Sequence, residues 1–231
     1  MKGRLYGVGV GPGDPELISI KACRILQMAD VLAAPSSSVE GTDIALDIAS
    51  YYIKPSTEIL HLPFPMTSDR TVLEQQWDKN ARSLQERLDL GQNVAFVTIG
   101  DPMIYSTYIY MLQRLAQLGY DIETIPGIPS FCASAAAAQM PLGKGGDAIT
   151  IIPGDPQKVL DAQSGISSTL VFMKPSGHGR KIARMLAQAG YRNVTLISHA
   201  GQRGQKIWRD ISAADWEDID YMSIIIARKD E

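Results

Sequence analysis

The sequence predicts an α/β protein of two domains, each with a mostly parallel mixed β-sheet. Short apolar runs that end at glycine or proline alternate with amphipathic stretches long enough for helices, which is typical of βα units. A helix-to-strand joint also recurs, at Leu118-Gly119-Tyr120 and at Ala189-Gly190-Tyr191, where glycine suits the helix C-cap. Because Pro-Gly-Ile-Pro-Ser at 126–130 interrupts the pattern, we expect domains at 1–125 and 126–231, with a hinge near 125–130.

In the first half, apolar runs predict strands at 5–10, 31–34, 58–62, 94–99 and 122–125. Amphipathic spacing predicts helices at 17–28, 43–52, 71–90 and 108–118. Apolar positions of the third helix should be buried, namely Leu73, Trp77, Leu84 and Leu88. We interpret Cys23 as a core residue and His61, alternating with apolar residues, as structural.

The second half begins with an alanine-rich helix at 131–140 and a glycine-rich connection at 141–147, which is either a lid or a linker. Strands are predicted at 149–152, 169–173 and 194–198, with a basic amphipathic helix at 180–188. Two further strands, 207–211 and 223–227, have no crossover helix between them. We therefore expect them to pair antiparallel at the end of the second sheet.

Composition narrows the classes of function. With 45% hydrophobic residues and a net charge of −3, the chain can form real cores and is a poor candidate for nucleic-acid binding. Its two cysteines and three histidines lack ligand spacing, so we predict neither a metal site nor a disulfide framework. No apolar run approaches the roughly 20 residues that cross a bilayer, and no signal peptide is evident. We expect a cytoplasmic protein that does not bind membranes.

The first predicted strand runs into a glycine-dense stretch, Gly-Val-Gly-Val-Gly-Pro-Gly-Asp-Pro at 7–15. Alternate glycines leave one strand edge bare, so that a ligand or another backbone can approach closely. The alternative is that the glycine-rich turn serves packing alone. The spacing fails the G-x-G-x-x-G fingerprint, which argues against a Rossmann site. Gly143-Lys144 is followed by Gly145, so a Walker phosphate loop is also absent.

A second turn joins a predicted strand to a helix at Gly100-Asp101-Pro102. Such a turn exposes backbone groups at a strand's carboxyl end, where ligands bind in open α/β sheets. Asp101 can accept hydrogen bonds from a ribose or an amine. The alternative is that Asp101 only caps the helix.

Four motifs occur in a fixed order along nearly the whole chain. They are the stretch at 7–15, Gly100-Asp101-Pro102 with Tyr105-Ser106-Thr107, the 126–130 segment, and Ser198-His199-Ala200-Gly201. Together they resemble the tetrapyrrole methylase family, which uses S-adenosylmethionine (SAM). Tyr-Ser-Thr after Gly-Asp-Pro, and Pro-Gly-Ile-x-Ser-Phe before the alanine-rich helix, are most similar to the precorrin-2 carbon-20 methyltransferases of cobalamin synthesis.

The resemblance implies SAM bound in a cleft between two α/β domains, in a homodimer, with S-adenosylhomocysteine as product. By position, the implied SAM contacts are Pro12, Gly100, Asp101, Met103, Ile104, Ser130, Phe131, Met173 and Ala200. Many relatives have Thr or Ser where Pro129 stands, which removes one side-chain hydrogen bond next to Ser130.

Methyl transfer from a sulfonium is an in-line displacement in which the positive charge fades. A carboxylate against the sulfur would stabilise the ground state more than the transition state, so mostly apolar or backbone-presenting residues suit this reaction. Alignment and exclusion of water then supply the rate. The acceptor carbon must later lose a proton to a modest base or to water. Tyr105 and His199 are the candidates, and each is equally explained by packing or positioning.

The implied substrate carries many carboxylates, so its pocket should present basic groups over an apolar floor. The candidates are Lys174, His178, Arg180, Lys181 and Arg203, for which the alternative is an ordinary solvated surface. Any cobalt would arrive inside the substrate. Competing interpretations are a methylase for another tetrapyrrole intermediate, for rRNA or for an elongation-factor product, or a non-catalytic module that binds an adenosine compound.

Overall fold

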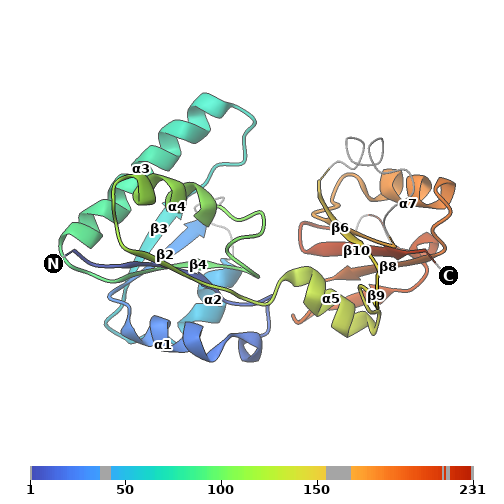
Figure 1. Ribbon diagram of the computed structural model, residues 1–231, viewed down its shortest axis with the longest axis horizontal. Helices are drawn as coiled ribbons and strands as arrows, with labels where there is room; N and C mark the ends of the chain where they lie inside the picture. Colours follow the sequence, from blue (N-terminus) through green and yellow to red (C-terminus); the bar gives the residue numbers. More distant parts are fainter. Residues whose placement is uncertain (1, 37–42, 155–167, 215, 217–218, 230–231) are drawn as a thin grey trace. The chain divides into compact units, whose positions relative to one another are not determined.

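The computed structural model describes residues 2–36, 43–154, 168–214, 216 and 219–229. The chain separates into two compact units, Met1–Pro129 and Ser130–Glu231, and each contains one five-stranded sheet (Figure 1). The expected α/β class is therefore confirmed. The residues that the sequence predicts as turns after the strands at 31–34 and 149–152 include 37–38 and 155–156, which lie outside the described residues.

The first sheet is wholly parallel. In spatial order its strands are β3 (Glu58–Pro63), β2 (Val31–Ser36), β4 (Val94–Thr98), β1 (Leu5–Gly9) and β5 (Ile122–Ile125). The strands β1 and β4 are fully buried, as expected for parallel strands that are covered on both faces. Their near-continuous apolar sequence reflects this burial.

Two helices cover each face of the first sheet (Figure 1). On one face α3 (Arg70–Asp89) and α4 (Tyr108–Gln117) enclose a core with Leu5, Val94 and Phe96. On the other face α1 (Ile20–Met28) and α2 (Ile44–Ser50) enclose one with Val8 and Val97. The alternation of side chains along each strand divides these two cores.

Capping residues set the helix starts. The Ser19 hydroxyl accepts from Ala22 N at 3.1 Å and starts α1 at Ile20. The prediction of a helix from residue 17 was therefore wrong by one turn, because Pro15–Leu17 forms a separate 3₁₀ helix. The strand β2 also continues through Pro35. Its pairing with β4 ends at Ala33, so at Pro35 the strand pairs with β3 alone and tolerates a proline.

Burial follows the predicted pattern along α3, with exceptions elsewhere. Trp77, Leu84 and Leu88 are buried and Leu73 is half-buried. Cys23 is half-buried rather than in the core, and burial raises the pKa of its thiol. His61 is exposed on β3, one of the two edge strands of the sheet.

The second sheet is mixed. Its spatial order is β6 (Ile149–Pro153), β7 (Thr169–Met173), β10 (Ser223–Arg228), β8 (Asn193–Ser198) and β9 (Lys206–Trp208). The pair β6–β7 is parallel, whereas β10 is antiparallel to both of its neighbours and β9 is antiparallel to β8. The prediction that the last two strands pair with each other was wrong, because β10 inserts between β7 and β8.

Among the residues that the structure describes, two α-helices flank the second sheet. The helix α5 (Ser130–Ala138) packs against β8 and β10, while α7 (Gly179–Gln188) buries Ile182 and Leu186 on the opposite face (Figure 1). The predicted strand at 207–211 stops at Trp208, since Asp210 caps a 3₁₀ helix at Ile211–Ala213. Within the part of the chain that the structure describes, no helix combines the length and apolar character needed to span a bilayer.

Candidate active site

The first unit has a topological switch point between β1 and β4. From β1 the chain moves to β2 through α1 on one face, and from β4 it moves to β5 through α4 on the other. Where neighbouring parallel strands diverge in this way, a ligand crevice forms outside their carboxyl ends. The 7–15 stretch and the Gly100-Asp101-Pro102 turn both begin at these ends.

Glycines from three strand ends converge at this point. Gly100 N donates to Gly11 O at 2.7 Å, which joins the loops after β4 and β1. A Cβ built on Gly9 would lie 2.6 Å from Gly127 N and 2.7 Å from Gly100 O, and one on Gly127 would lie 2.1 Å from Gly100 O. The expectation that the bare strand edge admits another backbone is confirmed. These contacts put Pro12, after Gly11, next to the Gly100 turn.

Asp101 ties this turn to the loop after β5. Its Oδ1 accepts from Met103 N at 2.8 Å and its Oδ2 accepts from Gly127 N at 3.0 Å. Asp101 does not cap α4, whose N-cap is Thr107. The carboxylate therefore fixes the shape of the site, and each oxygen still has a lone pair for a ligand.

The side chains after Asp101 present apolar surface. Met103 is 52% exposed and Tyr105 is 46% exposed, while Ile104 is half-buried. Tyr105 adopts a left-handed backbone with φ 49°, which is uncommon for a bulky residue. The first unit therefore offers backbone groups, one anchored carboxylate and an exposed apolar and aromatic flank.

In the second unit, the matching strand ends belong to β7 and β8, which flank the start of β10. Met173 and Ala200 lie at these ends with 8% and 6% exposure. Lys174 and His199, the residues next to them, are both left-handed, with φ 55° and 53°. Lys174 Nζ lies 4.8 Å from the centre of the Tyr221 ring, a cation–π contact.

His199 belongs to a closed ring of polar contacts. Its Nδ1 lies 2.9 Å from Ser198 Oγ and its Nε2 lies 3.1 Å from Asp220 Oδ2. Ser223 Oγ closes the ring, at 3.1 Å from Ser198 Oγ and 3.3 Å from Asp220 Oδ1. Both imidazole nitrogens are engaged, so the ring holds His199, and with it the turn that presents Ala200.

The remaining predicted contacts lie on α5 and around α7. Ser130 is half-buried at the first position of α5 and Phe131 is 8% exposed. His178 is the N-cap of α7 without a capping side-chain bond, Lys181 is exposed on α7, and Arg203 is exposed in the turn after β8. The structure places these residues within one unit but does not join them in a single pocket.

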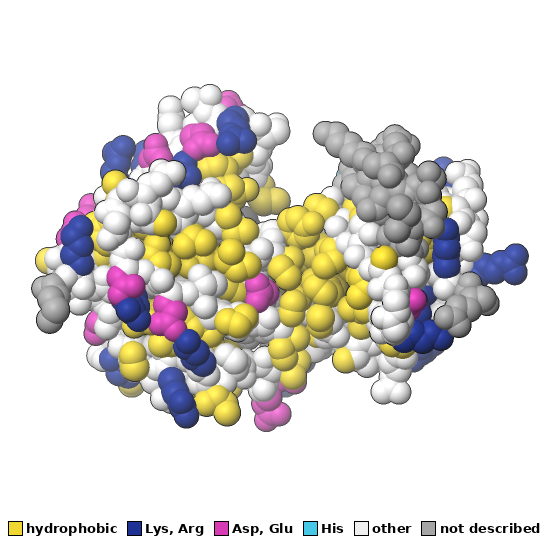
Figure 2. All heavy atoms as spheres, in the orientation of Figure 1, with side chains coloured by type: hydrophobic (Ala, Val, Ile, Leu, Met, Phe, Trp, Pro, Cys, Tyr) yellow, Lys and Arg dark blue, Asp and Glu magenta, His cyan; other side chains and the backbone are white. Residues whose placement is uncertain are grey.

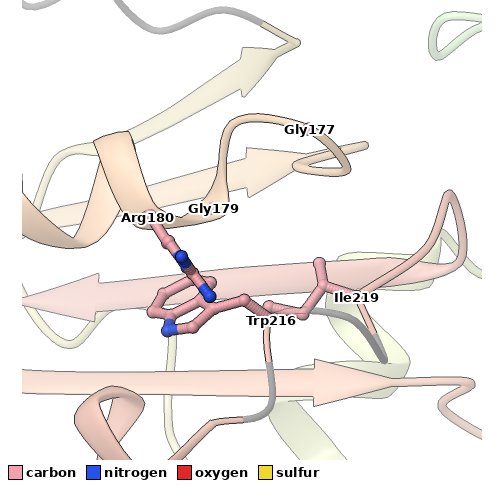
Figure 3. Close-up of a pocket in the computed structure, with 5 residues that line it drawn as sticks. All are labelled: Gly177, Gly179, Arg180, Trp216 and Ile219. Atoms are coloured by element: carbon pink, nitrogen blue, oxygen red, sulfur yellow. The ribbon is translucent and has the colours of Figure 1, made fainter.

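Arg180 lines a cavity of about 270 Å³ with Gly177, Gly179, Trp216 and Ile219 (Figure 3). In Figure 3 its side chain extends from the start of α7 toward the Trp216 indole. A Cβ on Gly179 would lie 2.6 Å from a Trp216 ring carbon, so the indole rests on the helix backbone. A cation beside an aromatic surface is suited to an anionic group on an apolar ligand.

A family model for tetrapyrrole (corrin/porphyrin) methylases matches residues 4–213. The chain belongs to this family. It is 36% identical to the cobalt-precorrin-2 C(20)-methyltransferase of Salmonella typhimurium, over 99% of this chain and 98% of that one. It is 31% identical to a probable cobalt-precorrin-2 C(20)-methyltransferase of Methanocaldococcus jannaschii, over 98% and 96% of the two chains. The resemblance found in the motifs is therefore confirmed.

A solved tetrapyrrole methylase, the cobalt precorrin-4 methyltransferase CbiF, matches with a TM-score of 0.72 at 25% identity, over 97% of this chain and 94% of that one. The uroporphyrin-III C-methyltransferase of Thermus thermophilus, solved with S-adenosylhomocysteine, matches with a TM-score of 0.73 at 20% identity, over 98% of each chain. The two-unit α/β architecture is thus the tetrapyrrole methylase fold.

Three residues that shape the strand ends and the cavity described above were absent from the sequence-based set: Gly127, Trp216 and Asp220. Gly127 lies in the 126–130 motif, yet its contact with Gly9 depends on the order of the strands in the sheet. Asp220 reaches His199 only because β10 inserts beside β8. No local pattern marks Asp220 or Trp216. Among the described residues, no three His, Cys, Asp or Glu side chains gather as a metal site.

Proposed function

We propose that this chain is a SAM-dependent C-methyltransferase that methylates carbon 20 of precorrin-2 or cobalt-precorrin-2 in cobalamin biosynthesis. The observation that carries this assignment is the 36% identity to a cobalt-precorrin-2 C(20)-methyltransferase over essentially the full length of both chains. The glycine-lined strand ends of the first unit support the assignment, because they leave backbone groups available to a ligand.

The first unit fits a sulfonium methyl donor. Asp101 already accepts two backbone N–H groups, so its charge is compensated within the protein. Bound SAM supplies the electrophilic methyl group. The remaining lone pairs of Asp101 would accept from its ribose or amine, and backbone groups of Gly100 would orient it. Pro12, Met103 and Ile104 would exclude water from it, which favours in-line transfer.

The second unit would complete the site. We propose that Ser130, Phe131, Met173 and Ala200 contact the cofactor. The buried Met173, Phe131 and Ala200 offer apolar surface and main-chain groups. The left-handed turn held by His199 and Asp220 fixes the backbone of Ala200.

Tyr105 is the better candidate to touch the acceptor ring and receive its proton. It is nearly half exposed and follows the turn that carries the proposed cofactor contacts. Both nitrogens of His199 are engaged by Ser198 and Asp220, so His199 is better suited to positioning than to proton transfer. Lys174, His178, Arg180, Lys181 and Arg203 are proposed to bind the peripheral carboxylates.

The test is a methylation assay with precorrin-2 and with cobalt-precorrin-2, followed by mass and positional analysis of the product. Carbon-20 methylation of either substrate, with S-adenosylhomocysteine formed in equal amount, supports the proposal. Methylation at another position, or only of another tetrapyrrole, would place the chain elsewhere in the family. SAM binding without turnover on any tetrapyrrole would favour a binding module. Light scattering would test the proposed homodimer, and cell fractionation its cytoplasmic location.

A further inference from the structure

The second unit contains a second cavity, at the opposite end of its strands from the proposed methylation site. It has a volume of about 340 Å³ and is lined by Gln139, Met140, Pro141, Lys144, Asn193, Thr195, Arg209, Arg228 and Lys229. The strand β10 runs from Ser223, beside the His199 ring, to Arg228 at this cavity. That length corresponds to roughly 17 Å, so the two sites are separate.

Positive charge is concentrated at this cavity. Four of the nine lining residues are Lys or Arg, although the chain as a whole carries a net charge of −3. Figure 2 shows several Lys and Arg side chains on the second unit, with an acidic side chain among them. Gathering like charges is unfavourable unless a counter-charge is supplied.

Within the described part of the chain, Asp147 supplies a carboxylate to this group. Asp147 Oδ2 lies 2.9 Å from Arg228 Nη2, and it also accepts from Lys144 N at 3.0 Å. The Lys144 N–H lowers the pKa of Asp147, which keeps it charged. Arg209 donates to the Ala138 carbonyl at 2.8 Å, and Lys229 lies over the Tyr191 ring. Neither of these two has a carboxylate partner among the described residues.

The lining also holds the cations in place and adds neutral donors. Arg228 is only 12% exposed and is fixed by Pro141 O at 2.6 Å, so it is preorganised. Arg209 is held against the carboxyl end of α5. Asn193 and Thr195, with an amide and a hydroxyl side chain, line the same cavity. Planar guanidinium groups beside amide and hydroxyl donors match the geometry of carboxylate and phosphate oxygens.

We propose that this cavity is a binding site for a small multivalent oxyanion, a phosphate or a polycarboxylate. The site is independent of the proposed methyl transfer, because none of its lining residues belongs to the methylation site. The volume lies at the lower end of ligand pockets, which suits a small anion rather than a whole macrocycle.

Isothermal titration of the full chain with inorganic phosphate and with citrate tests the site. Saturable binding of either anion to the wild type is expected. The anion that binds more tightly shows whether the site prefers a phosphate or a polycarboxylate. Lys229→Gln should weaken it roughly tenfold, because one charge-assisted contact is lost. Asn193→Asp should abolish it, since the new carboxylate neutralises the cations from within. Asn193 is exposed, and its replacement should not lower the thermal midpoint.

Lys206→Gln is the matched control, because Lys206 lies on β9 of the same unit and does not line the cavity. Its affinity for the anion should equal that of the wild type. Absence of saturable binding of both anions to the wild type would overturn the proposal. So would equal weakening by Lys206→Gln, or unchanged binding by Asn193→Asp. SAM affinity should be the same in all variants, so this test is separate from that of the methyltransferase.

Discussion

Gly127→Ala tests whether close backbone packing builds the cofactor end of the first unit. The new Cβ would lie 2.1 Å from Gly100 O and 2.9 Å from Gly9 Cα and C. All three atoms are main chain, so no side-chain rotation relieves the overlap. The backbone of Gly127 does not have a positive φ, so the free-energy cost of the new Cβ comes from steric overlap and not from backbone strain. Overpacking costs about 1–3 kcal/mol, and we expect the upper part of that range.

Thermal unfolding measures this cost. A loss of about 2–3 kcal/mol corresponds to a fall in Tm of roughly 5–10 °C for a chain of this size. SAM affinity, measured well below Tm where the protein remains folded, should also fall, because Gly100 and Asp101 must move away from Gly127. Gly146→Ala is the control, since nothing lies within 4 Å of its new Cβ. If both variants had the same Tm and SAM affinity, the packing argument would be refuted.

Three further substitutions test other parts of the structure. Arg180→Ala should raise KM for the tetrapyrrole about tenfold and change kcat less, because it removes a binding contact. Arg184 is exposed on the same helix and does not line the cavity, so Arg184→Ala should change neither constant. Asp220→Asn should weaken the contact to His199 Nε2, because an amide oxygen is a poorer acceptor than a carboxylate, and should lower SAM affinity several-fold; unchanged SAM affinity would contradict the positioning role of this pair. Burial raises the pKa of Asp43 in the folded protein. The stability that its protonated form contributes is therefore present at acidic pH and is lost as the pH rises through the raised pKa. Denaturant titrations should show that Asp43→Asn gains stability relative to the wild type toward neutral pH.

The elements that the sequence predicts best are buried strands bounded by turn residues. The strands at 122–125 and 169–173 match their predicted limits, because an apolar run ends where glycine, proline or a polar residue begins. The error at β10 has a different origin. Its Ile-Ile-Ile-Ala run at 224–227 indicates a fully buried strand, which a sheet end would not provide, but the choice of neighbours depends on long-range packing.

The same distinction between local sequence and long-range packing applies to the site residues. Asp101 was found from its turn, but its partner Gly127 N lies 26 positions away and depends on β1 separating β4 from β5. The pairing of His199 with Asp220 likewise follows from the insertion of β10. Local chemistry therefore identified which residues lie at strand ends, whereas the sheet order determines which of them touch.

Backbone strain gives an independent reason to place function at these strand ends. Of the four non-glycine residues with positive φ in the described ranges, Tyr105, Lys174 and His199 follow β4, β7 and β8, and the fourth, Gln139, ends α5. Each such conformation costs about 1–2 kcal/mol and persists only where its surroundings enforce it. The His199 ring and the Lys174–Tyr221 contact provide that enforcement in the second unit. Relaxed turns would have sufficed to connect these strands, so the retained strain favours a role in presenting backbone and side chains to a ligand.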